Sequence, residues 1–161
     1  MPLPVNFTGL SGEWKGTKRL YLAGGSGPEK SSGSRMTIAK AARGTFLLLD
    51  YTWKFDGDPQ EGVLLLGCDA TQSTATAAWG DSWHMSQKIM HCVGTIDERV
   101  INVRGSFEVP PGSDWGWRIT LTINGDDSIR LVMHNISPDA PDAKEDLAVR
   151  AEFARVGTNF F

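Results

Sequence analysis

The features that would assign this chain to a membrane or to an oxidising compartment are missing from its sequence. No apolar run approaches the roughly 20 residues that a membrane-spanning helix needs. The N-terminus, MPLPVNFTGLSGEW, has neither the basic start nor the apolar middle of a signal peptide. We therefore expect a cytoplasmic protein that has no membrane partner.

Cysteine is scarce, with only Cys68 and Cys92, each in an apolar segment. Without a secretion signal, two reduced thiols are expected rather than a disulfide. No CxxC pair or cysteine–histidine cluster with zinc spacing occurs. The spacing of His84, His91 and His134 does not bring three ligands together either. The sequence therefore predicts no metal site, and its residues by themselves indicate no cofactor.

A strong excess of one charge is also missing. The chain has 16 Lys and Arg against 19 Asp and Glu, a net charge of −3. No basic surface for nucleic acid is expected from this balance. The phosphate loop G-x-x-x-x-G-K-[ST] and the nucleophile elbow G-x-S-x-G are both absent. These absences argue against a P-loop nucleotidase and against a hydrolase of the nucleophile-elbow type.

Glycine, tryptophan and short alternating segments are abundant instead. The chain contains 18 Gly and 6 Trp. Ten segments of strand length follow one another with turn residues between them, and no amphipathic segment of helix length interrupts them. We expect strands at about 13–22, 34–42, 45–55, 62–69, 74–83, 88–96, 100–108, 115–124, 128–136 and 147–156.

Short links between so many strands predict an antiparallel sheet that closes on itself. Closure removes exposed strand edges, and no long Greek-key crossover is evident. The expected fold class is all-β, a single up-and-down barrel of about ten antiparallel strands over residues 1–161. Residues 1–11 are expected to form an arm that either covers one barrel end or frays. Residues 24–33 are expected to form a glycine-rich loop, and 157–161 an apolar tail that docks on the barrel or makes a homodimer.

The stretch Ala75–Met85, ATAAWGDSWHM, holds the densest set of candidate functional residues. Trp79, Asp81 and Trp83 are spaced two apart, so in a strand they share one face, and His84 follows at its end. A carboxylate among large aromatic rings needs partners, because an unpaired buried charge is costly. We therefore predict that Asp81 is largely buried and is held by a cation or by at least two hydrogen-bond donors.

The same alternation extends the candidate site to other strands. Trp53 and Trp117 fall on apolar faces, and His91 shares a face with two aliphatic residues. Arg118 alternates with polar residues and becomes a cavity cation only if a bulge reverses its strand. The ligand-binding set predicted for the cavity is Trp53, Trp79, Asp81, Trp83, His91, Trp117 and Arg118.

Two motifs near the ends of the chain resemble those of a known group of barrels. Gly12-Glu13-Trp14 forms a G-x-W on the first strand, and Arg155 ends the last strand. In both respects the chain resembles lipocalins and related calycins, in which such a tryptophan lies at the barrel base with a late arginine across its ring. The resemblance implies that Trp14 and Arg155 form a structural pair at one barrel end.

The middle of the chain resembles a calycin-like family of uncharacterised, mostly bacterial proteins with a W-x-D-S motif. The matching pieces include Gly67-Cys68-Asp69, Trp79-Gly80-Asp81-Ser82 and Phe153-Ala154-Arg155, and the resemblance runs from about residue 10 to residue 156. An acidic residue common on the ninth strand is replaced near Met133-His134. The resemblance implies a barrel with a small cavity and no established activity.

Three binding or catalytic functions remain open, beside a structural or assembly role in which the tail Val156–Phe161 docks onto the barrel or a second subunit. The first is binding of a small hydrophobic or amphipathic molecule inside the barrel. The second is a barrel enzyme of isomerase or dehydratase type, with Asp81 and either His84 or His91 as acid–base partners. The third is haem binding, because nitrobindin-like barrels hold haem through one late-strand histidine, and His134 is the only late histidine here.

Overall fold

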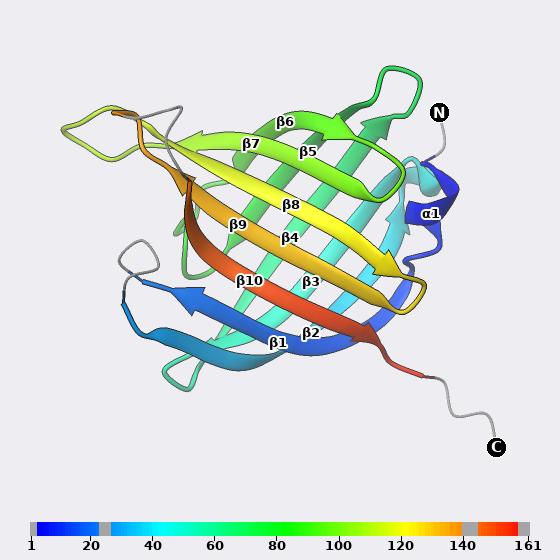
Figure 1. Cartoon of the computed structure of the whole chain (residues 1–161), viewed down its shortest axis with the longest axis horizontal. Helices are drawn as coiled ribbons and strands as arrows, with labels where there is room; N and C mark the ends of the chain where they lie inside the picture. Colours follow the sequence, from blue (N-terminus) through cyan, green and yellow to red (C-terminus); the bar gives the residue numbers. More distant parts are fainter. Residues whose placement is uncertain (1–2, 23–26, 140–144, 158–161) are drawn as a thin grey trace.

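Ten strands form one closed antiparallel barrel (Figure 1). The computed structural model describes residues 3–22, 27–139 and 145–157. Each strand pairs with its neighbours in sequence, and the first pairs with the last to close the barrel, which confirms the predicted all-β up-and-down fold. The strands are β1 (Gly12–Tyr21), β2 (Glu29–Ala41), β3 (Phe46–Phe55), β4 (Asp58–Asp69), β5 (Thr74–Asp81), β6 (Met90–Ile96), β7 (Val100–Phe107), β8 (Trp115–Gly125), β9 (Ser128–Ile136) and β10 (Asp146–Arg155).

The first hairpin is longer than expected. Residues 29–33, predicted to lie in a glycine-rich loop, open β2 instead and pair with β1 as far as Tyr21↔Glu29. These residues, EKSSG, include no hydrophobic side chain, so the sequence shows no strand signal there. The hydrogen-bonded ladder with β1 nevertheless satisfies their backbone groups, and this decides the conformation.

The second hairpin is tighter than expected. Asp56 and Gly57 both have positive φ, the conformation that a two-residue hairpin turn requires. β4 therefore begins at Asp58, and the predicted start of this strand at residue 62 is wrong. The extra residues lengthen the ladder between β3 and β4 at that end of the barrel.

One end of the barrel, called here the closed end, is covered by the N-terminal arm. The short helix α1 (Val5–Thr8) lies across it (Figure 1), with Phe7 and Leu10 buried beneath. The indole N–H of Trp14 donates a 2.9 Å hydrogen bond to the Leu10 carbonyl. The described part of the arm therefore covers the barrel rather than fraying.

Arg155 fastens the closed end. Its guanidinium lies 4.4 Å from the centroid of the Trp14 ring, so the contact expected from the G-x-W resemblance is present. It also donates to the carboxylate of Asp127 and to carbonyl oxygens of the arm and of the β8–β9 turn. A cation over a desolvated indole stabilises by about 1–2 kcal/mol. Arg155 thus joins the arm, β1 and the β8–β9 turn.

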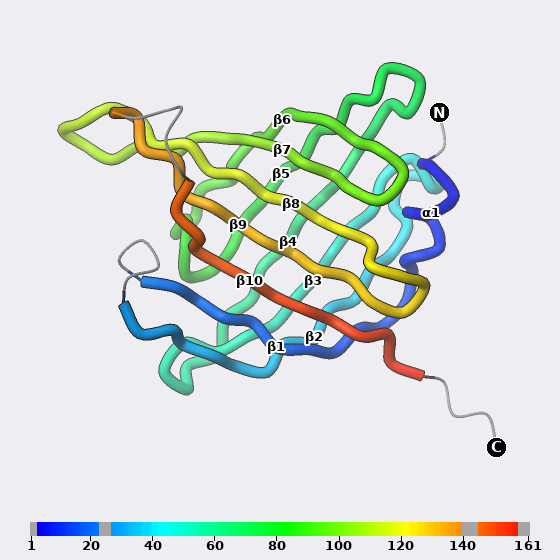
Figure 2. Tube along the Cα trace, in the orientation of Figure 1, coloured from blue at the N-terminus to red at the C-terminus, as the bar shows by residue number. Residues whose placement is uncertain are grey.

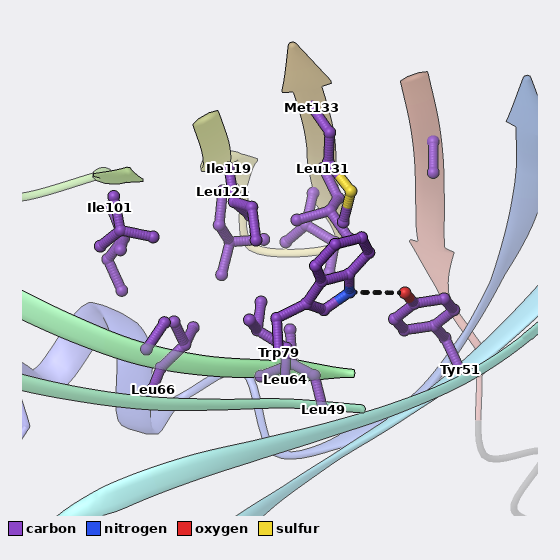
Figure 3. Close-up of a cluster of buried hydrophobic side chains, with 14 of the residues drawn as sticks. Leu49, Tyr51, Leu64, Leu66, Trp79, Ile101, Ile119, Leu121, Leu131 and Met133 are labelled. Carbon is purple, nitrogen blue, oxygen red and sulfur yellow. Dashed lines mark hydrogen bonds between the residues drawn. The ribbon is translucent and has the colours of Figure 1, made fainter. Parts of the chain in front are cut away.

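At the opposite end, called here the open end, the odd-numbered strands from β1 to β9 end and the even-numbered strands from β2 to β10 begin (Figure 2). Between the two ends the interior is filled by aliphatic side chains such as Leu49, Leu64 and Leu131 (Figure 3). Trp79 belongs to this layer, and its Nε1 donates a 2.9 Å hydrogen bond to the Tyr51 hydroxyl. This hydrogen bond links the aliphatic layer to the polar side chains of the interior.

Three further expectations concern thiols, membranes and the tail. Cys68 and Cys92 are free thiols, as expected. None of the helices in the described ranges has the length and apolar character needed to cross a bilayer. Within the apolar tail, residues 158–161 lie outside the described residues, so its docking and the homodimer stay predictions.

Candidate functional site

The candidate site is built where β5 ends, at the open end. Trp79 and Asp81 both point inward and are buried, as their spacing predicts. Oδ1 of Asp81 accepts hydrogen bonds from the backbone N–H groups of Trp83 at 2.9 Å and His84 at 3.3 Å. These bonds close a turn and end the strand. The expectation that the strand continues to Trp83 is wrong, and Trp83 lies in the turn with 36% of its surface exposed.

Asp81 is surrounded by donors. Its Oδ2 accepts hydrogen bonds from the Tyr51 hydroxyl at 2.8 Å and from Nε1 of Trp53 at 3.3 Å, and lies 3.8 Å from Nζ of Lys18. Its side chain is fully buried, so the predicted burial and pairing of Asp81 are confirmed. Burial by itself raises the pKa of Asp81. The hydrogen bond from His84 and the charge of Lys18 lower it by more than burial raises it, so the pKa lies well below its ordinary value. The carboxylate therefore stays ionised.

Sequence reasoning missed Lys18 and Tyr51. Lys18 lies two residues before the buried Leu20 on β1, so the alternation already placed it inward. Its Nζ lies 3.6 Å from the centroid of the Trp53 ring and has no hydrogen-bond partner in the described ranges. Burial lowers the pKa of Lys18 from 10.5 to about 8, although the charge of Asp81 opposes this. The alternation of β1 could therefore have predicted that Lys18 points inward. The alternation of β3 could likewise have predicted that Tyr51 lies on the same face as Trp53.

His84 is held through one ring nitrogen. Its Nδ1 lies 3.1 Å from Oδ1 of Asp81. Burial lowers the pKa of His84 below its ordinary value although Asp81 opposes this, so the ring is neutral at pH 7. Because an ionised carboxylate only accepts hydrogen bonds, we assign the single ring proton to Nδ1. Nε2 is then a lone-pair acceptor, and it is buried without a partner among the described residues.

Four tryptophan rings surround His84. The ring centroids of Trp53, Trp79, Trp83 and Trp117 lie between 4.8 and 5.8 Å from that of the imidazole. Trp79 and Trp117 stack on each other, with centroids 5.4 Å apart. Nε1 of Trp117 is buried and, within the described part of the chain, donates to no acceptor. The cluster therefore holds one unused acceptor and one unused donor.

A cavity of about 260 Å³ lies beside this cluster. Its walls are mainly apolar, formed by Trp79, Trp83, Phe107 and Trp117 together with aliphatic side chains and methionines. Tyr21, His84 and Asn135 add polar atoms to the lining. An apolar cavity with a few polar groups suits a small ligand that has an apolar body and a polar end.

His91, expected at the cavity, is exposed on the outer face of β6. Alternation predicts that His91 faces inward with Ile89 and Val93, but these two residues are themselves exposed. Met90 and Cys92 face the interior instead, because a shift of one residue reverses every side chain of a strand. The His91 prediction is wrong for this reason.

Arg118 and His134 also lie away from the cavity. No bulge reverses β8 at Arg118, whose guanidinium pairs on the outer face with Glu145 at 2.9 Å and with Asn102 at 2.8 Å. His134 is the register partner of Arg118 on β9 and shares that outer face. It therefore cannot hold a haem iron inside the barrel, and the haem alternative through His134 is wrong. The predicted residues that do gather around His84 are Trp53, Trp79, Asp81, Trp83 and Trp117.

The known proteins that resemble this chain share its fold but indicate no activity for it. Residues 6–155 match a family model described as "Protein of unknown function (DUF1579)". No curated protein matches the chain. The crystal structure of Rv2717c from M. tuberculosis is similar with a TM-score of 0.66 at 16% identity, covering 94% of this chain and 95% of that one. A redesigned β-barrel is similar with a TM-score of 0.50 at 12% identity, covering 98% and 100%. Such identities show the fold alone, and the calycin resemblance stays a prediction.

Proposed function

Since this chain belongs to the DUF1579 family of proteins of unknown function, we propose from its own site that it binds a small amphipathic molecule in the cavity at the open end. The observation that carries the proposal is an aromatic-lined cavity beside two buried, unpartnered nitrogens, Nε2 of His84 and Nε1 of Trp117. Buried polar groups are nearly always paired in native proteins. Each unpaired group costs about 1–3 kcal/mol, which a ligand offsets by pairing with it.

The size of the cavity limits the ligand. Its volume of about 260 Å³ lies just below the roughly 300–1,000 Å³ of common ligand pockets. A compound of one or two rings, or a short branched chain, fits this space better than a long acyl chain. Flat aromatic compounds gain most, because the walls offer the stacked rings of Trp79 and Trp117.

Contact between a ligand and the two unpartnered nitrogens requires a side chain to move. The two unpartnered nitrogens are shielded from water. Met85 lines the cavity and belongs to residues 82–89, which form turns rather than strand. A shift of Met85 therefore opens a path without breaking the hydrogen bonds of the barrel.

The binding proposal is tested by titrating one- and two-ring aromatic compounds while recording tryptophan fluorescence. We expect a saturable change, together with NMR shifts of the indole N–H groups of Trp79, Trp83 and Trp117. Ala148→Phe should abolish the response, because Ala148 lines the cavity and a ring there fills it. Ala154→Phe, on the exposed face of the same strand, is the matched control. Absence of a saturable response to every compound would contradict the proposal.

The contact between Asp81 and His84 supports a second function, acid–base catalysis. Catalysis by this pair requires a histidine nitrogen within hydrogen-bond reach of Asp81, and Nδ1 of His84 meets the requirement at 3.1 Å. Asp81 would hold the proton on Nδ1 and leave Nε2 to take a proton from the substrate. Such a base serves isomerases and dehydratases that remove a proton next to a carbonyl group.

The catalytic candidate is tested by following exchange of the α-hydrogens of phenylacetone with solvent deuterium. We expect exchange above the buffer rate that disappears in His84→Gln. His91→Gln provides the matched control, because His91 is exposed on the outer face of β6. Exchange that persists in His84→Gln would remove His84 from the reaction.

A further inference from the structure

The polar end of the ligand is restricted by the hydrogen bonds that the cavity leaves open. Asp81 fixes the proton of His84 on Nδ1, so Nε2 offers only a lone pair. The indole nitrogen of Trp117 offers only an N–H. The two rings are neighbours, with centroids 5.6 Å apart. A group that satisfies both must donate one hydrogen bond and accept another.

The charges around the cavity exclude an anionic end. None of the described residues that line the cavity is a lysine or an arginine. The buried cation nearby, Lys18, already lies beside the ionised Asp81, and Arg118 is bound to Glu145 on the outer face. A carboxylate would therefore lose its hydration without gaining a cation, and it would face the lone pair of Nε2.

We infer that the site selects a ligand with a neutral hydroxyl group, which donates to Nε2 of His84 and accepts from Nε1 of Trp117. The apolar body of the ligand then packs between the aromatic walls of the cavity. This inference rests on the proposed binding function and names its ligand class: small aromatic or branched alcohols and phenols. An ammonium group would leave the Trp117 N–H unpaired, and a methyl group would leave both nitrogens unpaired.

The test compares four compounds that share one ring system and differ in one group. They are 2-naphthalenemethanol, 2-naphthoate, 2-(aminomethyl)naphthalene and 2-methylnaphthalene, titrated calorimetrically at pH 7.5. We expect the alcohol to bind at least about tenfold more tightly than each of the others, the ratio that one good hydrogen bond supplies. Tighter binding of the carboxylate or of the amine would overturn the inference.

Two variants separate the hydroxyl contact from general packing. Trp117→Phe keeps a ring but removes the N–H, so the preference for the alcohol over the methyl compound should fall severalfold. Trp115→Phe makes the same change two residues away on β8, outside the cavity lining, and should leave that ratio unchanged. The two affinities in each ratio are measured on the same variant, so a general loss of stability affects both and leaves the ratio unchanged. An unchanged ratio in Trp117→Phe would overturn the inference.

The proton position on His84 is a separate measurement. Nitrogen-15 chemical shifts of the imidazole at pH 7.5 should show Nδ1 protonated and Nε2 unprotonated. A protonated Nε2 would overturn the inference. If the four compounds bind with similar affinity and all shift the indole N–H of Trp117, binding stands and the hydroxyl selection is wrong. If none binds, both the inference and the proposed function are wrong for ligands of this size.

Discussion

The ring of Tyr51 occupies the space where a side chain of Gly62 would stand. The two residues are register partners on β3 and β4, and a Cβ at position 62 would lie 2.1 Å from the Tyr51 ring. Gly62 is also the register partner of Asp81 on β5. The tyrosine therefore crosses β4 to reach the carboxylate two strands away, and a residue without a side chain makes that crossing possible.

We expect Gly62→Ala to displace the Tyr51 ring and break its hydrogen bond to Asp81. The loss of that bond and the crowding should lower the free energy of unfolding by about 1–3 kcal/mol, measured by urea denaturation. Gly80→Ala is the matched control on the adjacent strand, because a Cβ there lies 3.9 Å from its nearest neighbour, Val63. Equal destabilisation by the two variants would refute this role of Gly62.

Asp81→Asn keeps the shape of the side chain and removes its charge. Lys18 then loses its buried anion, so we expect the free energy of unfolding to fall by roughly 3 kcal/mol, with a lower melting temperature. The double variant Asp81→Asn with Lys18→Met should recover part of the loss, because it removes both charges together. A double variant as unstable as the sum of the single ones would show that the pair is not coupled. If stability stays level while ligand binding falls, Asp81 serves binding rather than the fold.

Lys18 should make stability depend on alkaline pH. Burial lowers its pKa from 10.5 to about 8, so between these values the unfolded chain binds a proton that the folded chain has released. Stability therefore rises with pH across this window, by up to about 3 kcal/mol from this group. Urea denaturation at pH 7.5, 9 and 10 should show the rise in the parent chain relative to Lys18→Met.

The control for Lys18 is Lys15→Met, which alters an exposed lysine on the same strand. Its stability should follow the parent chain at every pH. If Lys18→Met shows the same pH dependence as Lys15→Met, the folded-state pKa of Lys18 is not lowered.

At the closed end, Arg155→Lys keeps the charge but loses the planar group that spans several acceptors. We expect a loss of about 1–2 kcal/mol and faster hydrogen exchange at the Trp14 indole N–H, which bonds to the arm. Arg150→Lys, whose salt bridge with Glu152 is largely exposed, should change stability little. A similar effect of the two substitutions would contradict the fastening role of Arg155.

Alternation of side chains along single strands was enough to predict much of the fold. The strand segments and the inward positions of Trp79 and Asp81 follow from a period of two, and the short links between the segments predict the antiparallel order. The burial of Asp81 followed as well, because a carboxylate between inward-facing rings requires partners. Such local patterns determine which face of a strand a residue occupies.

Where a strand begins or ends was decided by hydrogen bonds that alternation does not record. The bonds from Trp83 and His84 to Asp81 end β5 and start the turns that lead to β6. In the register of β6 against β5, Met90 pairs with the inward-facing Trp79 and His91 pairs with Ala78, so His91 faces outward. The pairing of β6 with β5, which the sequence does not record, therefore excludes His91 from the predicted site.

The sequence by itself determined that this chain makes a ten-stranded barrel with Asp81 facing inward among aromatic rings. Only the tertiary structure decided that Lys18, Tyr51 and Trp117, from β1, β3 and β8, meet around Asp81 and His84. The physical reason is that the period of a strand fixes the face of each side chain. Closure and register fix which strands face each other across the interior, and these arise from pairing over the whole barrel.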